Sequence, residues 1–250
     1  MRLARALCGS EIAYGIVERS ALRIIEGNPF ERIEPTEKVV PLSSVQLLSP
    51  VEPSKVIAVG LNYIDHAKEL GMPVPEVPIL FMKPSTAVIG PGEKIIHPSS
   101  SEQVDYEAEL AVIIGKRSKD IPESETPDRI LGYSCGNDVT ARDLQKKDGQ
   151  WTRCKSFDTF CPLGPWIETE LDPSDLKIEA HLNGKEKQSS STANLIFGVE
   201  FLVSFISRVM TLLPGDVILT GTPFGVGPMK RGDEIEVRIE GIGSLVNAVI

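Results

Sequence analysis

The sequence predicts an α+β fold dominated by strands, with a small β-rich N-terminal domain over residues 1–53 and a larger domain over residues 54–250. Most of the chain consists of short apolar or alternating runs bounded by Gly, Pro, Asn or Asp, which is typical of strands and turns. Apolar residues recur at helical spacing over one long segment, 195–213. The boundary between the two parts is marked by prolines, namely Pro41, Pro50 and Pro53.

The first elements are predicted by apolar runs and by the residues between them. IAYGIVE and ALRIIEG are separated by Arg19 and Ser20 and predict a β-hairpin. KVIAVG at 55–60 is a continuous apolar run, typical of a buried strand. NYIDHAKELG predicts a helix that Asn62 or Asp65 caps and Gly71 ends. The proline-rich GMPVPEVP that follows predicts an exposed loop.

The middle of the chain predicts more strands and one short helix. ILFMKP and the stretch 107–114 have the apolar character of strands. A helix is expected over Glu123–Leu131, followed by a strand over Gly132–Cys135.

The C-terminal part combines an alternating hairpin, a helix and final strands. LKIEAHL alternates apolar and polar residues, and Asn183-Gly184 then predicts a hairpin turn. Apolar residues from Leu195 to Met210 predict a helix, which Pro214-Gly215-Asp216 ends. DVILTGT, EIEVRIE and SLVNAVI predict the last strands.

Charge and composition exclude several classes of protein. The net charge of −9 leaves no basic stripe for nucleic acid. The longest apolar stretch contains Glu200 and Arg208, so no membrane span is expected, and the start has no signal-peptide core. The cysteines form no C-x-x-C pair and are expected to be reduced thiols, Cys8, Cys135, Cys154 and Cys161. We therefore expect a cytoplasmic protein.

Three carboxylates form the most informative pattern. Glu107 and Glu109 are two apart, so on a strand both project from the same side. Asp138 follows another apolar strand. Such a trio is either a solvated strand edge or a hard oxygen site that suits Mg²⁺ or Mn²⁺. No Cys or His lies nearby in the sequence, which argues against zinc.

Two further groups have the character of catalytic residues. His66 and Glu69 share a helix face, so the carboxylate could orient the imidazole as a general base; the alternative is a surface pair. Lys155 stands among aromatic residues and could stabilise an enolate or a substrate carboxylate, or could be a surface lysine. TGTPFGVG lacks the G-K-[ST] of a nucleotide loop, and its backbone amides suit a small anion better.

Six segments, in order, resemble the fumarylacetoacetate hydrolase family and particularly its short bacterial members. They are KVIAVGLNYIDHAKEL, LFMKPSTAVIGPG, DYEAELAVIIGK, GYSCGNDVTARDLQ, WTRCKSFDTFCPLGPWI and LPGDVILTGTPFGVGP, and they extend over about residues 55–250. The resemblance implies a mixed β-sandwich roll, of the type of the family's C-terminal domain. It also implies a homodimer or a higher even homo-oligomer.

The resemblance assigns roles to residues of this chain. It implies Mg²⁺ or Mn²⁺ on Glu107, Glu109 and Asp138. His66 and Glu69 fall on the family's H-x-x-E dyad, which lies on a mobile lid, and Lys155 falls on its active-site lysine. The family's T-G-T-P loop, which lines the substrate carboxylate, falls on Thr220, Gly221, Thr222 and Pro223. Substrate contacts are expected from Tyr63, Lys83, Arg142, Gln145, Gly221 and Thr222.

Two departures from the family pattern bear on the reaction. Leu61 stands where members often carry Arg, so one contact to the substrate carboxylate is missing. Lys155-Ser156-Phe157 resembles the acylpyruvase branch, whereas DGQWTR and DTFCPLGPWI resemble the bacterial isomerase and decarboxylase branch.

The implied function is an enzyme that acts on a small 2-oxo or 2-hydroxy-2-enoic acid through a metal-stabilised enolate. The favoured type is the isomerase or decarboxylase of 2-hydroxyhepta-2,4-diene-1,7-dioate in aromatic catabolism. The alternative is an acylpyruvate (fumarylpyruvate) hydrolase or an oxaloacetate decarboxylase. A further alternative is a non-enzymatic metal- or ligand-binding protein of the same fold.

Overall fold

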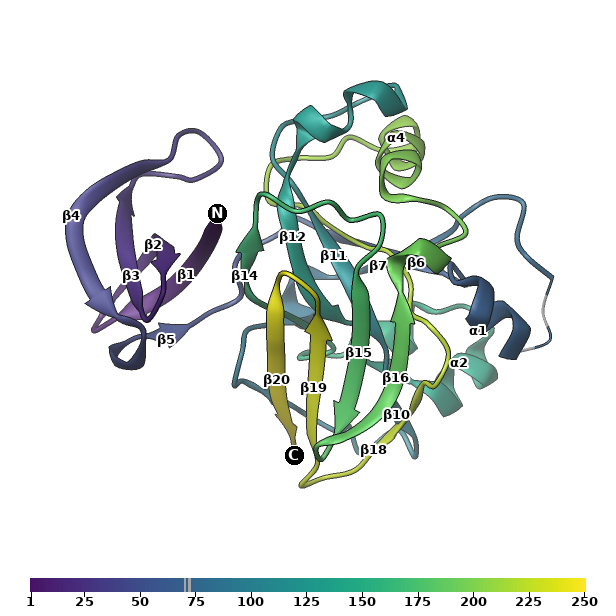
Figure 1. Ribbon diagram of the computed structural model, residues 1–250. Coiled ribbons are helices and arrows are strands. Elements are labelled where there is room, and N and C mark those ends of the chain that lie inside the picture. The colour runs from purple at the N-terminus through teal and green to yellow at the C-terminus, as the bar shows by residue number, and fades with distance from the viewer. Residues whose placement is uncertain (70, 72) are drawn as a thin grey trace.

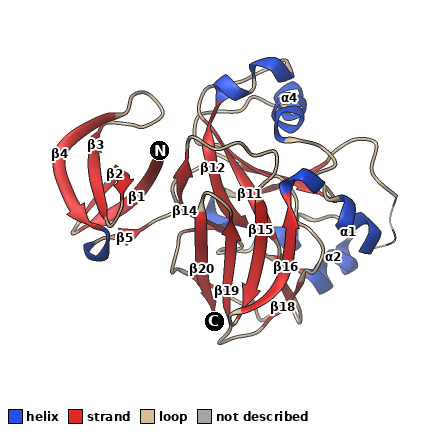
Figure 2. Ribbon diagram, in the orientation of Figure 1, coloured by secondary structure: helices blue, strands red, loops and turns tan. Residues whose placement is uncertain are grey.

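The computed structural model describes residues 1–69, 71 and 73–250. Strands dominate, arranged in sheets of twelve, five and three strands, and the helices are few and short (Figures 1 and 2). The predicted strand-dominated α+β fold is therefore confirmed. None of the helices in the described part of the chain has the length and apolar character needed to span a bilayer.

The N-terminal strands form an antiparallel meander at one side of the molecule (Figure 1). The predicted hairpin is present, since Val17 pairs with Leu22 and Glu18 with Ala21 across the turn. A short strand after the meander returns to pair with its first strand. The elements are β1 (Arg2–Cys8), β2 (Glu11–Glu18), β3 (Ala21–Glu26), β4 (Glu34–Pro41), η1 (Leu42–Ser44) and β5 (Gln46–Leu47).

The large sheet continues from the meander into the rest of the chain, because β1 pairs with β14. Its central strand β11 is buried along its whole length. Its sequence AELAVII is apolar except for Glu109, as expected of a strand that is covered on both faces. The strands that follow β1 across the sheet are β14 (Cys161–Glu168), β12 (Ile130–Asn137), β11 (Ala108–Ile114), β17 (Val217–Leu219), β6 (Val56–Gly60) and β7 (Ile79–Lys83).

The five-stranded sheet packs face to face on the large sheet. Ile178 and Val237 of the smaller sheet share one apolar core with Leu110 and Val112 of β11. Its strands are β16 (Lys185–Ser191), β15 (Lys177–Leu182), β19 (Glu234–Ile239), β20 (Gly243–Val249) and β9 (Lys94–Ile95). The third sheet contains β13 (Thr140–Ala141), β10 (Val104–Tyr106) and β18 (Gly227–Met229), and β8 (Val88–Ile89) pairs with β14.

The helices lie at the ends and edges of the sheets (Figure 2). The α-helices are α1 (Ile64–Glu69), α2 (Arg142–Asp148), α3 (Thr152–Lys155) and α4 (Val199–Val209). The 3₁₀ turns besides η1 are η2 (Ser85–Ala87), η3 (Glu123–Glu125), η4 (Pro127–Arg129) and η5 (Thr192–Asn194).

The expectation of a helix over Glu123–Leu131 is wrong. Two 3₁₀ turns occupy the segment, and β12 already begins at Ile130. Pro127 has no amide hydrogen, so a continuous helical ladder cannot pass through it, and the turns on either side stay separate.

Two predicted helices are present but shorter than expected. The helix expected from Leu195 begins only after Gly198, which stands at its N-cap. Asn62 does not cap α1, because its amide group binds Thr220 and Phe197 instead. Gly71 adopts the left-handed conformation that is expected where a helix ends. Leu70, in the predicted helix, and Met72, in the predicted loop, lie outside the described residues.

Candidate active site

Antiparallel pairing of β11 with β12 brings the three carboxylates together. Ala108 is opposite Asn137, and the Asp138 amide donates to the Glu107 carbonyl at 2.9 Å. Glu107 therefore lies beside Asp138, and Glu109 follows on the same side of the chain. One carboxylate oxygen from each residue lies within 4.8 Å of the others, and all three side chains are at most 6% exposed. The cluster is thus buried and is not a solvated strand edge.

Three cations contact two of these carboxylates. Lys155 Nζ donates to Glu107 at 2.9 Å and to Asp138 at 2.5 Å. Arg142 forms ion pairs with Glu107 and, at 2.8 Å, with Asp105. Lys83 donates to the Asp138 carboxylate and to the Val139 carbonyl.

The pKa values follow this distribution of charge. Burial tends to raise the pKa of Glu107, but the charges of Lys155 and Arg142 outweigh it and hold the pKa well below its usual range. Burial also raises the pKa of Glu109, and there the charges of Asp138 and Glu107 raise it further.

The donor set fits a hard divalent cation. Among the described residues, Glu109 forms no ion pair, and its side chain accepts a hydrogen bond from the Gly221 amide at 2.7 Å. Positive charge is therefore lacking on the Glu109 side of the cluster. Carboxylate oxygens are the donors that Mg²⁺ and Mn²⁺ prefer, and a cation between the three residues would supply the missing charge.

A cavity of about 220 Å³ opens beside the cluster. Its walls combine the charged residues with apolar side chains that lie on β6 and β7, just after β6 and just before α3. The structure brings together in its lining most of the residues expected from the sequence: His66, Glu107, Glu109, Asp138, Arg142, Gln145, Lys155 and Thr222. The apolar part consists of Val59, Leu61, Ile79, Phe81 and Trp151, with Gly60 between them.

Three residues expected to contact substrate lie outside this lining, and one of them, Gly221, donates its amide to Glu109. Lys83 is fully buried behind Asp138 and reaches the cavity only through that carboxylate. Tyr63 is also fully buried, and its hydroxyl has no hydrogen-bond partner among the described residues. Burial raises the pKa of Tyr63 above its usual range, and the nearby charge of Glu109 adds to the effect.

The His66–Glu69 dyad is formed on α1. His66 Nδ1 lies 2.9 Å from Glu69 Oε2, and the imidazole faces the cavity. Glu69 also accepts a hydrogen bond from the Gly225 amide at 3.2 Å, so the helix contacts the loop that follows β17. His66 is buried and Glu69 is partly exposed, unlike the surface pair of the alternative interpretation.

Sequence reasoning missed two groups of residues at this site. Asp105 is buried and accepts a hydrogen bond from Arg142. It stands two residues before Glu107, just as Glu107 stands two residues before Glu109, so this repeated spacing could have indicated that Asp105 belongs to the site. Trp151 packs edge-on to Phe81, whose ring lies 5.0 Å from the Lys155 ammonium. This aromatic contact joins two distant segments, and no local sequence pattern indicates it.

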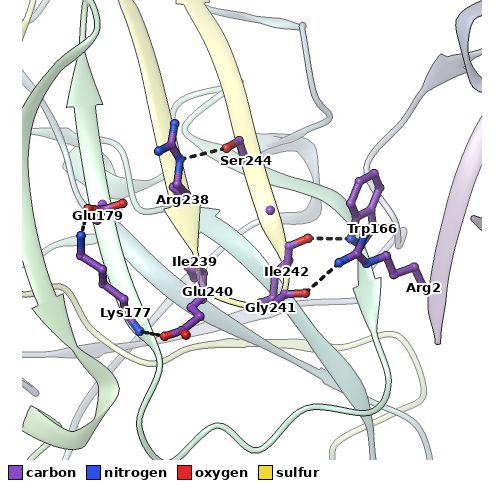
Figure 3. A pocket seen from close by; sticks show the side chains of 11 residues that line it. Arg2, Trp166, Lys177, Glu179, Arg238, Ile239, Glu240, Gly241, Ile242 and Ser244 are labelled. Atoms are coloured by element: carbon purple, nitrogen blue, oxygen red, sulfur yellow. Dashed lines mark hydrogen bonds and ion pairs between the residues drawn. The ribbon is translucent and has the colours of Figure 1, made fainter. Parts of the chain in front are cut away.

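A second, larger pocket of about 500 Å³ lies between β1 and the β19–β20 hairpin (Figure 3). Arg2 stacks over Trp166 there and donates to the Gly241 carbonyl, while Trp166 donates to the Ile242 carbonyl (Figure 3). Lys177 and Arg238 are bonded to glutamates. Since these charges are satisfied by neighbouring groups, we assign no ligand to this pocket.

Comparison with known proteins identifies the class to which this fold and site belong. Residues 55–250 match the family described as fumarylacetoacetate (FAA) hydrolase C-terminal, and residues 1–50 match the family described as Rv2993c-like, N-terminal. The chain therefore belongs to the fumarylacetoacetate hydrolase family, a family of enzymes that includes isomerases and hydrolases.

Individual relatives differ in the reactions that their names give. The chain is 46% identical to 2-hydroxyhepta-2,4-diene-1,7-dioate isomerase from Mycobacterium marinum, with a TM-score of 0.94 over 100% of this chain and 98% of that one. It is 45% identical to the mitochondrial oxaloacetate tautomerase FAHD2A of Bos taurus, over 85% of this chain and 72% of that protein. Maleylpyruvate hydrolase from Sphingobium sp. SYK-6, in complex with manganese(II) and pyruvate, is 30% identical with a TM-score of 0.84, over 100% and 99% of the chains.

Proposed function

We propose that this protein is a Mg²⁺- or Mn²⁺-dependent enzyme that isomerises or decarboxylates a small 2-oxo or 2-hydroxy-2-enoic acid. The favoured type is the 2-hydroxyhepta-2,4-diene-1,7-dioate isomerase of aromatic catabolism, acting in the cytoplasm. One observation carries the proposal: three buried carboxylates, Lys155 and His66 line one small cavity. The similarity to the named isomerase and tautomerase supports it.

Glu107, Glu109 and Asp138 would hold the ion, which when bound supplies a Lewis acid that withdraws electron density from a 2-oxo group. The chain's own cations add to this effect at the same end of the cavity. Burial lowers the pKa of the Lys155 ammonium, but the charges of Asp138 and Glu107 outweigh it, so the pKa is raised and Lys155 stays protonated. It can therefore stabilise negative charge that develops on the substrate oxygen.

His66 is the group that moves the proton. Its Nδ1 is bonded to Glu69, which leaves Nε2 to exchange a proton with a substrate carbon or a water molecule. The Thr222 hydroxyl lines the same cavity and can bind the substrate carboxylate, while the Gly221 amide is already bonded to Glu109. The apolar wall of Phe81 and Trp151 limits the access of water to this end.

Hydrolysis of an acylpyruvate is the second candidate function. A histidine held by a carboxylate beside the cavity is the arrangement that activates a water molecule, and the similarity to maleylpyruvate hydrolase favours it. A protein that only binds a ligand would not need this dyad, so we do not favour the non-enzymatic alternative.

The test is an assay of the purified protein with a panel of 2-oxo acids. Oxaloacetate, acetylpyruvate and 2-hydroxyhepta-2,4-diene-1,7-dioate are supplied with Mg²⁺, with Mn²⁺ and with excess chelator. We expect turnover that the chelator stops and added ion restores. Full activity in the chelator, or no turnover of any member, would refute the proposal.

We also propose a homodimer or a higher even homo-oligomer. Support comes from the edge strand β7, where the apolar side chain of Met82 is exposed in the single chain. Light scattering of the purified protein tests this directly, and a monomeric mass would contradict it.

A further inference from the structure

Strand β16 presents two polar side chains to the active site and a third away from it. Gln188 and Ser190 are two apart and pair with Ala180 and Ile178 of β15, whose side chains are fully buried in the core. Ser189 lies between them and pairs with Glu179. Since side chains alternate across a strand, Gln188 and Ser190 face the core side and Ser189 faces the other.

Ser190 is bonded to the helix that carries His66. Its hydroxyl donates to Asp65 Oδ2, and Asp65 Oδ1 accepts the backbone amide of His66 at 2.7 Å. The Asn194 side chain donates to the same Ser190 oxygen at 3.1 Å, so this hydroxyl has both a donor and an acceptor partner. A chain of hydrogen bonds therefore runs from β16 to the residue that faces the cavity.

The contact of Glu69, on α1, with the Gly225 amide also depends on β16. Glu69 accepts the amide of Gly225, and a side chain at Gly225 would place its Cβ 2.3 Å from the Lys187 carbonyl of β16. The loop can approach the strand this closely because position 225 is glycine.

Gln188 extends the same support to the rest of the site. It is fully buried, and its amide donates to the Thr222 hydroxyl at 2.9 Å and to the Pro223 carbonyl at 2.8 Å. Its oxygen accepts the amide of Ala108, between the two glutamates of the cluster, at 2.9 Å.

We propose that Ser190 is a positioning residue, which acts through Asp65 to hold His66 at the correct place over the carboxylate cluster. The inference rests on the proposed function only in taking His66 as the proton-transferring group. A helix of six residues has little stability of its own, so its position depends on such side-chain contacts. A misplacement of about 1 Å is enough to slow a reaction by orders of magnitude.

The test compares three variants in the full-length, metal-loaded protein. Ser190→Ala removes the hydroxyl, Ser190→Thr retains it, and Ser189→Ala is the matched control on the opposite face of the same strand. Loss of a hydrogen bond to a carboxylate weakens the positioning of α1, and we therefore expect kcat to fall about tenfold in Ser190→Ala. We expect Ser190→Thr to recover most of the activity and Ser189→Ala to behave as the unmodified protein.

Two further readouts separate positioning from a general loss of structure. Calorimetric titration with Mn²⁺ should give the same affinity in Ser190→Ala and Ser189→Ala, because neither residue contacts the carboxylate cluster. The NMR chemical shifts of the His66 imidazole should change in Ser190→Ala only, since its contact with Glu69 depends on the position of α1. Equal kcat in the two alanine variants, or unchanged chemical shifts of the His66 imidazole, would overturn the proposal.

The NMR measurement also distinguishes this inference from the proposed function. If the unmodified protein turns over no 2-oxo acid, the proposed function fails, whereas a His66 resonance that moves in Ser190→Ala and not in Ser189→Ala still supports the positioning role. If the protein is active and the alanine variants are indistinguishable by either readout, the positioning role fails alone.

Discussion

Glu109 is the residue at which the cluster is electrostatically incomplete. Burial raises its pKa in the folded protein, and so do the charges of Asp138 and Glu107. A folded pKa above the unfolded value means that the metal-free folded state retains a proton that the unfolded chain loses. The free energy of unfolding of the metal-free protein must therefore fall as the pH rises above the ordinary value of 4.5.

Glu109→Gln should remove this loss of stability. In excess chelator, we expect the melting temperature of the variant to exceed that of the unmodified protein by a margin that grows as the pH rises from about 5 to about 8. Glu107→Gln is the control of opposite sign. The folded pKa of Glu107 is lowered, so its substitution should destabilise most at neutral pH and less in acid. Parallel pH profiles for the three proteins would contradict the charge distribution described here.

Lys83 acts on the cluster from behind the cavity. It is fully buried and bonded to one oxygen of Asp138, so it fixes how that carboxylate is presented to the cavity. We expect Lys83→Met to weaken Mn²⁺ binding about 10- to 100-fold, measured by calorimetric titration. Lys55→Met is the matched control, because Lys55 forms a similar ion pair with the buried Asp216 outside the cavity lining. A Mn²⁺ affinity changed equally in both variants would argue against the specific role.

At the scale of elements, the sequence predicts those whose signal is local. The hairpin turn at Asn183-Gly184 is confirmed, since both residues adopt the positive φ angles that such a turn requires. The expectation of a helix over 123–131 is wrong because Pro127 interrupts the helical ladder and β12 already begins at Ile130, which pairs with Ile114. Glu179 is one of the polar residues of the alternating LKIEAHL, yet it is buried, and Lys177 and His181 both contact its carboxylate.

The parts of the site that could not be predicted are those made by contacts between distant elements. E-x-E and the later Asp138 could be recognised as possible ligands because each lies beside an apolar strand. The role of Ser190 could not be recognised, since QSS has no local signal and gains its meaning only when β16 lies beside α1. The contact between Gly60 and Trp151 could not be predicted either, because the two residues are far apart in the sequence.

Gly60→Ala tests how closely β6 and α3 must approach. A Cβ at Gly60 would lie 2.5 Å from the Trp151 ring, which therefore has to move. The Trp151 carbonyl accepts the amide of Lys155 at 3.2 Å, so a shift of Trp151 would also displace the active-site lysine. We expect kcat/KM to fall at least about tenfold. Gly198→Ala should leave it unchanged, since no atom lies closer than 4.0 Å to its added Cβ.

At the scale of the whole molecule, the N-terminal meander is joined to the large sheet by a short ladder. Arg2 pairs with Glu168 and Leu3 with Ile167 between β1 and β14. Glu168 reinforces this ladder with its side chain, which accepts hydrogen bonds from the amino group of Met1 at 2.8 Å and from Arg2 at 3.1 Å. One mostly buried carboxylate thus connects the start of the chain to a strand that also pairs with β12.

Glu168→Gln should weaken that connection in a pH-dependent manner. Burial tends to raise the pKa of Glu168, but the bonds from the N-terminal amino group and from Arg2 outweigh it, so its folded pKa is lowered. Its contribution is therefore complete above the unfolded pKa and is lost as the pH falls through the folded value. We expect a loss of about 1–3 kcal/mol in the free energy of unfolding at pH 7, and a smaller difference in acid.

The control for this change is Glu18→Gln, which removes an ion pair with Arg23 that is exposed on the surface of the meander. Water and salt screen such pairs, so this substitution should change the stability little at any pH. Urea unfolding at several pH values measures both variants. If Glu168→Gln were as mild as Glu18→Gln at neutral pH, the paired backbone of β1 and β14 would be sufficient to hold the N-terminal meander on the large sheet.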